Sequence, residues 1–137
     1  MTETAVRVEI RDDRVPDAKE ALALFDRLNW AKTAHRNAER FQAAMESSWP
    51  LVTAWEGARL VGICRVIADG QYTAYISDLA IDPDFQGKGI GAEVVERVLR
   101  LLEGYDTIAL ITGVDKYEFW EKFGFTNFPG AMMLRHW

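Results

Sequence analysis

The sequence predicts a mixed α/β (α+β) fold, in which a mostly antiparallel sheet carries helices. Runs of alternating or continuous apolar residues indicate strands, and segments with apolar residues every three or four positions indicate amphipathic helices. The two patterns follow one another in the order βαα, βββ, α, β, α, ββ, without repeats or long linkers. A length of 137 residues suits a single domain. We therefore expect residues 1–137 to form one domain.

The first half of the chain holds one predicted strand, two predicted helices and then three predicted strands. The three strands are joined by hairpins, because Gly57 and the pair Asp69-Gly70 supply residues that tolerate positive φ. Strands are expected at residues 6–10, 51–55, 60–68 and 72–81, and helices at residues 18–28 and 34–45.

The second half begins with a long amphipathic helix, predicted at residues 90–102. Residues 107–111 form a short apolar run, which is typical of a central strand covered on both faces. A short helix is expected at 115–123, ended by Gly124, and the tail 125–135 is expected to supply two more strands. An exposed apolar strand at 131–134 would offer an edge for a homodimer.

Composition excludes several classes of protein. Apolar residues make up 49% and charged residues 27%, which is too hydrophobic for a disordered chain. The net charge of -5 argues against a nucleic-acid partner, because phosphate binding needs clustered Lys and Arg. Membrane-spanning runs and an apolar leader at residues 1–7 are not seen, which predicts a cytoplasmic protein. The single cysteine, Cys64, lies in a strand-like segment and is expected to be a small core residue; no metal site is predicted.

The most informative segment is a glycine-rich turn that leads from strand 72–81 into helix 90–102. Gly87, Gly89 and Gly91 let the backbone approach a ligand and turn several N–H groups toward one point. These amides join the positive end of the helix, and Lys88 adds a positive charge. The spacing matches neither the Walker pattern nor the dinucleotide fingerprint. The turn therefore predicts a site for a phosphate or pyrophosphate.

The segment 86–91, Gln-Gly-Lys-Gly-Ile-Gly, resembles the Gln/Arg-x-x-Gly-x-Gly/Ala motif of the GCN5-related N-acetyltransferase (GNAT) superfamily. Residues 76–83 are similar to the strand that enters that motif, and residues 118–125 resemble the late helix and its Gly-Phe exit. The order of elements matches this superfamily from about residue 6 to residue 134. The resemblance implies an acyl-CoA N-acyltransferase fold with a mostly antiparallel sheet.

The resemblance further implies that acetyl-CoA is the donor and the primary amine of a small molecule the acceptor. The acetyl group would pass directly to the amine in a ternary complex. The backbone around Leu79 would pair with the pantetheine arm, and its amide would donate to the developing oxyanion. The implied cofactor-binding residues are Leu79, Ala80, Ile81, Gln86, Gly87, Lys88, Gly89, Ile90, Gly91 and Trp120.

Catalysis needs a proton acceptor, because an alkylamine with a pKa of about 10.4 is protonated at neutral pH. Asp78, on the strand before the motif, is the first candidate for this base, and its alternative role is a structural hydrogen-bond acceptor. Glu56 and His35 are further candidates if they face the site, although the polar neighbours of His35 are typical of a solvated surface residue.

Catalysis also needs a proton for the departing thiolate. The superfamily often places a Tyr where this sequence has Trp120, and an indole is no practical acid. Tyr117 lies about one helical turn earlier and is a candidate for that role, or else an ordinary aromatic of an amphipathic helix. Turnover does not require this acid, because a thiolate whose conjugate thiol has a pKa near 8.5 is a good leaving group.

The acceptor side is open to several interpretations. Five aromatic residues either shape an apolar slot or fill the core: Phe25, Trp30, Phe41, Trp49 and Trp55. Acidic residues at 26, 39 and 46 would attract a cationic acceptor. Two alternative functions stay open, which are a non-catalytic acyl-CoA sensor and a peptide or protein acetyltransferase.

Overall fold

The protein is described by a computed structural model that covers residues 7–137. Residues 1–6 lie outside this part, so the start of the strand predicted at 6–10 and most of the segment inspected for a leader are not described. The first strand that is described, β1, runs over Glu9–Arg11.

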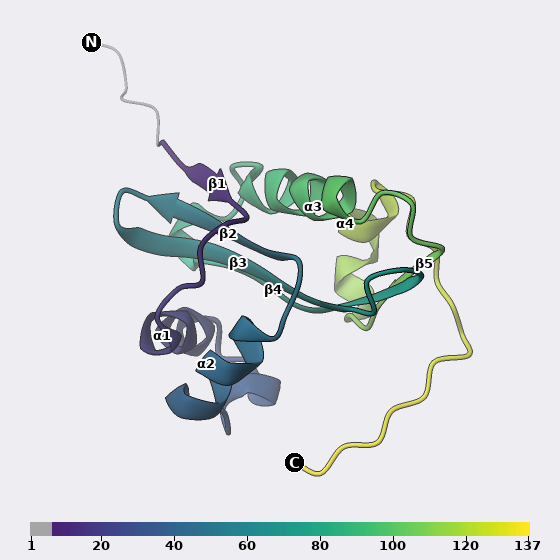
Figure 1. Ribbon diagram of the computed structural model, residues 1–137, viewed down its shortest axis with the longest axis horizontal. Coiled ribbons are helices and arrows are strands. Elements are labelled where there is room, and N and C mark those ends of the chain that lie inside the picture. Colours follow the sequence, from purple (N-terminus) through teal and green to yellow (C-terminus); the bar gives the residue numbers. More distant parts are fainter. Residues whose placement is uncertain (1–6) are drawn as a thin grey trace.

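The strands of residues 7–137 form one mixed, twisted sheet with the order β1-β2-β3-β4-β5 (Figure 1). Each strand from β1 to β4 pairs with the next one in antiparallel orientation, and β5 pairs with β4 in parallel orientation. The further strands are β2 (Leu51–Glu56), β3 (Arg59–Ala68), β4 (Thr73–Ile81) and β5 (Thr107–Leu110). The predicted α/β class with a mostly antiparallel sheet is confirmed.

Helices cover both faces of this sheet. In Figure 1, α1 and α2 lie on one face, and α3 lies on the other with α4 beside it. The α-helices span Ala18–Leu28 (α1), Ala38–Glu46 (α2), Ile90–Leu101 (α3) and Tyr117–Glu121 (α4). Short 3₁₀ turns span Ala31–Thr33 (η1), Pro83–Phe85 (η2) and Val114–Lys116 (η3). Within residues 7–137, no helix has the length and apolar character needed to cross a membrane.

The two faces of the sheet bury separate clusters of apolar side chains. Val94, Val95 and Val98 of α3 pack on one face, while Leu24 and Phe25 of α1 pack on the other. A β-bulge in β4 shifts the alternation of its side chains between these clusters by one residue, because Arg65 pairs with Asp78 whereas the next residue of β3 pairs with Ile76. Ala74 and Ile76 before the bulge face α3, whereas Asp78 and Ala80 after it face α1 and α2.

Three sequence expectations need correction. The second helix begins at Ala38 rather than residue 34, because the side chain of Asn37 accepts a hydrogen bond from Arg40 N–H and caps the helix there. The strand β5 lies at the edge of the sheet and is half exposed, with β4 as its strand neighbour, so it is not central.

The third correction concerns the C-terminal tail. Residues 125–135 form no strand in the structure, and Met132 and Leu134 are exposed. Phe125 is the residue through which this segment packs on the α3-side core. The homodimer expected from an edge strand at 131–134 therefore loses its structural basis.

Packing of β3 against its neighbours yields a stability prediction. A Cβ added to Gly62 would lie 2.9 Å from Ile81 Cδ1 and 3.1 Å from Ala54 Cβ. Gly62→Val overfills this space and is expected to lower the free energy of unfolding by about 1–3 kcal/mol, measured by urea denaturation. Gly62→Ala, the control, is expected to cost less, because the end of the Ile81 side chain can move. Wild-type stability for Gly62→Val would contradict the packing described.

Candidate functional site

The second half of β4 has a strand neighbour on one side and none on the other in the described chain. Pairing with β5 ends at Ile76, whereas β4 continues to Ile81. The N–H of Asp82 donates to the Val61 carbonyl at 2.8 Å, and hydrogen-bonded pairs alternate along an antiparallel ladder. The amides of Leu79 and Ile81 therefore point away from β3, toward the unpaired edge.

The glycine turn begins where this edge ends. Gln86 Nε2 donates to the carbonyl of Ile81 at 3.0 Å, which holds the turn against the end of β4. Gly87 and Gly89 adopt φ values of 77° and 81°, the left-handed region that glycine enters without strain. Gly89 caps α3 without a side chain, so the first amides of this helix are available to a ligand. The predicted anion cradle therefore has the backbone conformation that such a cradle requires.

The residues of this turn fit the pyrophosphate of acetyl-CoA. Added Cβ atoms on Gly87 or Gly89 would meet nothing within 4 Å, so the turn opens to solvent. Lys88 is exposed beside it and is free to approach a phosphate. The start of α3 and the unpaired edge of β4 thus offer backbone donors to the two ends of one extended ligand.

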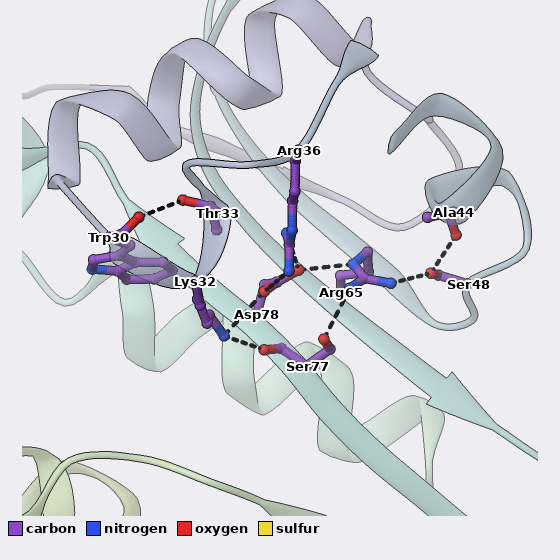
Figure 2. A network of polar contacts seen from close by, with 9 residues as sticks. All are labelled: Trp30, Lys32, Thr33, Arg36, Ala44, Ser48, Arg65, Ser77 and Asp78. Atoms are coloured by element: carbon purple, nitrogen blue, oxygen red, sulfur yellow. Dashed lines mark hydrogen bonds and ion pairs between the residues drawn. The ribbon is translucent and has the colours of Figure 1, made fainter. Parts of the chain in front are cut away.

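On the face of β4 that is turned toward α1 and α2, a buried carboxylate, Asp78, lies among three cationic side chains (Figure 2). Arg36 donates two hydrogen bonds to the oxygens of Asp78, at 3.0 and 3.1 Å. Arg65 Nε lies 2.8 Å and Lys32 Nζ 3.1 Å from the same carboxylate. Lys32 and Arg65 also donate to the backbone oxygen and hydroxyl of Ser77 at the bulge. This Asp78 cluster joins the α1–α2 connection to β3 and β4.

The environment of Asp78 does not suit the general base expected from the sequence. Burial by itself raises the pKa of this carboxyl, but the hydrogen bonds from Arg36 and the charges of Arg65 and Lys32 outweigh burial and lower the pKa to about 2. A carboxylate held this strongly in its charged form is a weak proton acceptor at neutral pH. The alternative considered from the sequence, a structural acceptor, agrees with the geometry.

A second buried carboxylate, which sequence reasoning did not single out, fixes the strand-to-turn junction. Asp82 pairs with Arg27 at 2.8 Å and Arg59 at 2.9 Å, and accepts from Asp84 N–H at 2.9 Å. Burial opposes its ionisation, yet these partners lower its pKa. The Asp-Pro pair at 82–83 signalled a turn in the sequence, but the two arginines come from distant segments.

The predicted residues of α4 lie beside the start of α3. Phe119 would be 3.6 Å from a Cβ added to Gly91, which places the two helices in contact at the glycine turn. Tyr117 is partly exposed, and its hydroxyl lies 3.5 Å from Asn127 Oδ1. Trp120 is 7% exposed and packs edge-on against Phe119 and Phe125 in the α3-side core.

The remaining predicted residues divide between core and surface. Cys64 is fully buried in β3, and burial raises the pKa of its thiol. His35 is exposed and stacks on Trp137, with ring centroids 5.1 Å apart. Among the five aromatic residues considered for the acceptor side, three are buried in the α1-side core, Trp30 packs at its margin and Trp49 is exposed; the buried three are Phe25, Phe41 and Trp55.

Comparison with known proteins agrees with this geometry. A family model described as the acetyltransferase (GNAT) family matches residues 10–125. The chain belongs to the GNAT family of acetyltransferases. Over 148 residues this acetyltransferase is 28% identical to the uncharacterized N-acetyltransferase ycf52 of Porphyra purpurea, covering 100% of this chain and 83% of that protein.

Two plant relatives carry more specific names. Histone acetyltransferase TAP1 of Glycine max is 27% identical to this acetyltransferase over 134 residues, or 88% of this chain and 57% of that one. Chloroplastic serotonin N-acetyltransferase 2 of Oryza sativa subsp. japonica is 33% identical over 103 residues, which cover 71% of this chain and 52% of that one. A solved structure from Staphylococcus aureus, named as a probable acetyltransferase, is 25% identical with a TM-score of 0.80 and covers 95% of this chain and 100% of that one.

The Asp78 cluster gives this acetyltransferase a predicted dependence of stability on acid pH. The pKa of Asp78 falls from 3.8 to about 2 on folding, so its charged form stabilises the fold above about pH 4. The contribution, on the order of 2 kcal/mol, is lost as the pH falls from about 4 toward 2. Asp78→Asn strands three cations without their carboxylate and is expected to cost about 3 kcal/mol or more at pH 7.

Urea denaturation at pH values from about 2 to about 7 measures this effect. The difference in the free energy of unfolding between wild type and Asp78→Asn is expected to narrow toward the acid end. Asp12→Asn is the control, because Asp12 pairs with Arg97 at the surface and contributes little. A gap that stays constant with pH, or no loss of stability for Asp78→Asn at pH 7, would contradict the role given to the cluster.

Proposed function

We propose that this acetyltransferase moves the acetyl group of acetyl-CoA to the primary amine of a small molecule, by direct attack in a ternary complex. The observation that carries the proposal is the unpaired edge of β4, with the Leu79 and Ile81 amides directed outward, continuous with the glycine turn at the start of α3. An extended thioester ligand needs backbone donors along its arm and an anion site at its far end.

In the proposed reaction, acetyl-CoA supplies an acyl thioester. The unprotonated amine nitrogen bonds to the carbonyl carbon and the carbon–sulfur bond breaks. The nitrogen releases one proton as it becomes an amide, and the thiolate takes up one proton to become the thiol. The amide of Leu79 donates to the oxygen that gains negative charge. The single cysteine, Cys64, is fully buried with a raised pKa, which supports transfer without an acyl-enzyme on that thiol.

Asp78 acts in this proposal as a positioning residue rather than as the base. Its ion pairs hold Lys32, Arg36 and Arg65 beside the bulge of β4, one residue away from Leu79. We assign the protonation of the thiolate to Tyr117, because it is partly exposed on the same helix as Phe119, which meets Gly91, whereas Trp120 is enclosed in the core.

A small acceptor is favoured over a protein acceptor by the form of the surface beside Asp78. A hollow of about 180 Å³ lies there, which is the size of a small functional group rather than a peptide groove. The rice relative is named for serotonin, a small amine, and the soybean relative for histones. Assaying a panel of small amines and lysine peptides for coenzyme A release discriminates between these acceptor classes.

The glycine turn carries a binding prediction. Gly89→Glu adds a carboxylate and a side chain where the pyrophosphate is proposed to bind, so acetyl-CoA affinity is expected to fall by about 100-fold, measured by calorimetric titration. The matched control is Gly70→Glu, because Gly70 also has a positive φ and open surroundings but lies in the β3–β4 hairpin. Normal acetyl-CoA binding by a folded Gly89→Glu variant would show that the site is misplaced.

The role of Tyr117 is tested separately from binding. Tyr117→Phe removes the hydroxyl and keeps the ring, so kcat at saturating acetyl-CoA is expected to fall by about 10- to 100-fold with acetyl-CoA affinity unchanged. The alkaline limb of the pH profile is expected to shift as well, since the proton donor is lost. Unchanged kcat with an unchanged pH profile would return Tyr117 to an ordinary helix aromatic.

A further inference from the structure

The hollow beside the Asp78 cluster is lined by cationic side chains, although the protein as a whole is acidic. It lies between the start of α2 and β3, and has a volume of about 180 Å³. Its lining contains three arginines, a histidine and an asparagine, and no carboxylate: His35, Arg36, Asn37, Arg40, Phe41, Ala44 and Arg65. With a net charge of -5 for the chain, this local concentration of positive charge does not follow from composition.

Two of these arginines already have a carboxylate partner, yet positive charge remains in excess. Arg36 and Arg65 share Asp78 with Lys32, so three cations meet one anion. In the described chain, each of these three residues has Asp78 as its acidic partner within ion-pair distance. The cluster therefore retains two positive charges, and buried or half-buried excess charge strongly attracts a counter-ion.

Arg40 adds a further cation at the mouth of the hollow. It is exposed on the first turn of α2, and within residues 7–137 its side chain forms no ion pair. Guanidinium groups bind carboxylates and phosphates through paired, parallel hydrogen bonds. Phe41 supplies an apolar wall beside these groups, and the guanidinium of Arg36 lies 5.0 Å from its ring.

We propose that this hollow binds a carboxylate or phosphate group on the acceptor, so that the preferred substrate is an amine that also carries an anion. The inference rests on the proposed function, because it assigns the acceptor class of the same site. Arg36 and Arg65 connect the hollow to Asp78, and Asp78 precedes the proposed oxyanion donor Leu79. An anion held by these arginines thus lies one layer of side chains from the reacting edge of β4.

This acceptor class differs from the cationic one considered from the sequence on the basis of Asp26, Glu39 and Glu46. Asp26 lines a separate, smaller hollow with Trp30, of about 140 Å³. That hollow is the place where a second ammonium group of a diamine would bind. The two hollows therefore predict opposite acceptors, a diamine for the hollow at Asp26 and an amine with an anionic group for the hollow beside the Asp78 cluster. The second is favoured because Lys32, Arg36 and Arg65 together outnumber the one carboxylate that they surround.

Matched acceptor pairs test the inference through kinetics. Phenylalanine is compared with phenethylamine and phosphoethanolamine with ethanolamine, and putrescine serves as the diamine. The anionic member of at least one pair is expected to have a kcat/KM about tenfold higher or more. Arg40→Gln is expected to reduce that preference by about five- to tenfold, mainly through KM. The matched control is Arg100→Gln on the exposed side of α3, which should leave it unchanged.

A preference of the wild-type enzyme for the partner without the anionic group, or for putrescine, would overturn the inference, while the transferase itself would stand. A preference for the anion that survives Arg40→Gln undiminished would overturn it too.

A binding measurement keeps the inference testable if no amine is acetylated. The chain has two histidines, and His35 lines the hollow. Its imidazole NMR signals, assigned with His35→Gln, are expected to shift on titration with millimolar inorganic phosphate, and the shift should be lost in Arg40→Gln. No shift of the His35 signals would refute the anion site. Failure to bind acetyl-CoA, measured in parallel, would instead refute the proposed function.

Discussion

The arrangement of this acetyltransferase depends on one buried carboxylate, Asp78, and the three cations around it. A desolvated carboxylate is costly unless charged donors surround it, so Lys32, Arg36 and Arg65 are drawn to one point from the α1–α2 connection and from β3. The cluster fastens the helical connection between α1 and α2 onto the middle of the sheet. It also secures the bulge at Ser77, because two of the cations bind that residue.

The bulge in β4 changes which of its residues face each side of the sheet. The side chains of Ala74 and Ile76, before the bulge, enter the α3-side core, whereas Asp78, an even-numbered position after the bulge, directs its side chain to α1 and α2. Meanwhile the outer edge of β4 has no strand partner beyond Ile76 in the described chain. The proposed donor site therefore uses backbone amides at that edge, and the proposed acceptor site uses side chains on the α1–α2 face.

Local features were predictable from the sequence, and features that depend on distant contacts were not. Helix α3 and the glycine turn follow from periodicity and from Gly87 and Gly89, because their conformation is set within a few residues. The cationic partners of Asp78 come from segments 13 to 46 positions away, so a lone strand Asp offered a base as readily as an anchor. The edge position of β5 depends on which strands pair, which its short apolar run does not encode.

Amide hydrogen exchange shows whether acetyl-CoA binds along the unpaired edge of β4, as proposed. The amides of Leu79 and Ile81 point outward, whereas that of Ala80 points to β3 and is already paired there. Addition of acetyl-CoA is expected to slow exchange at Leu79 and Ile81 while leaving Ala80 unchanged. If saturation with acetyl-CoA leaves exchange at both outward amides unaltered, acetyl-CoA does not bind along this edge.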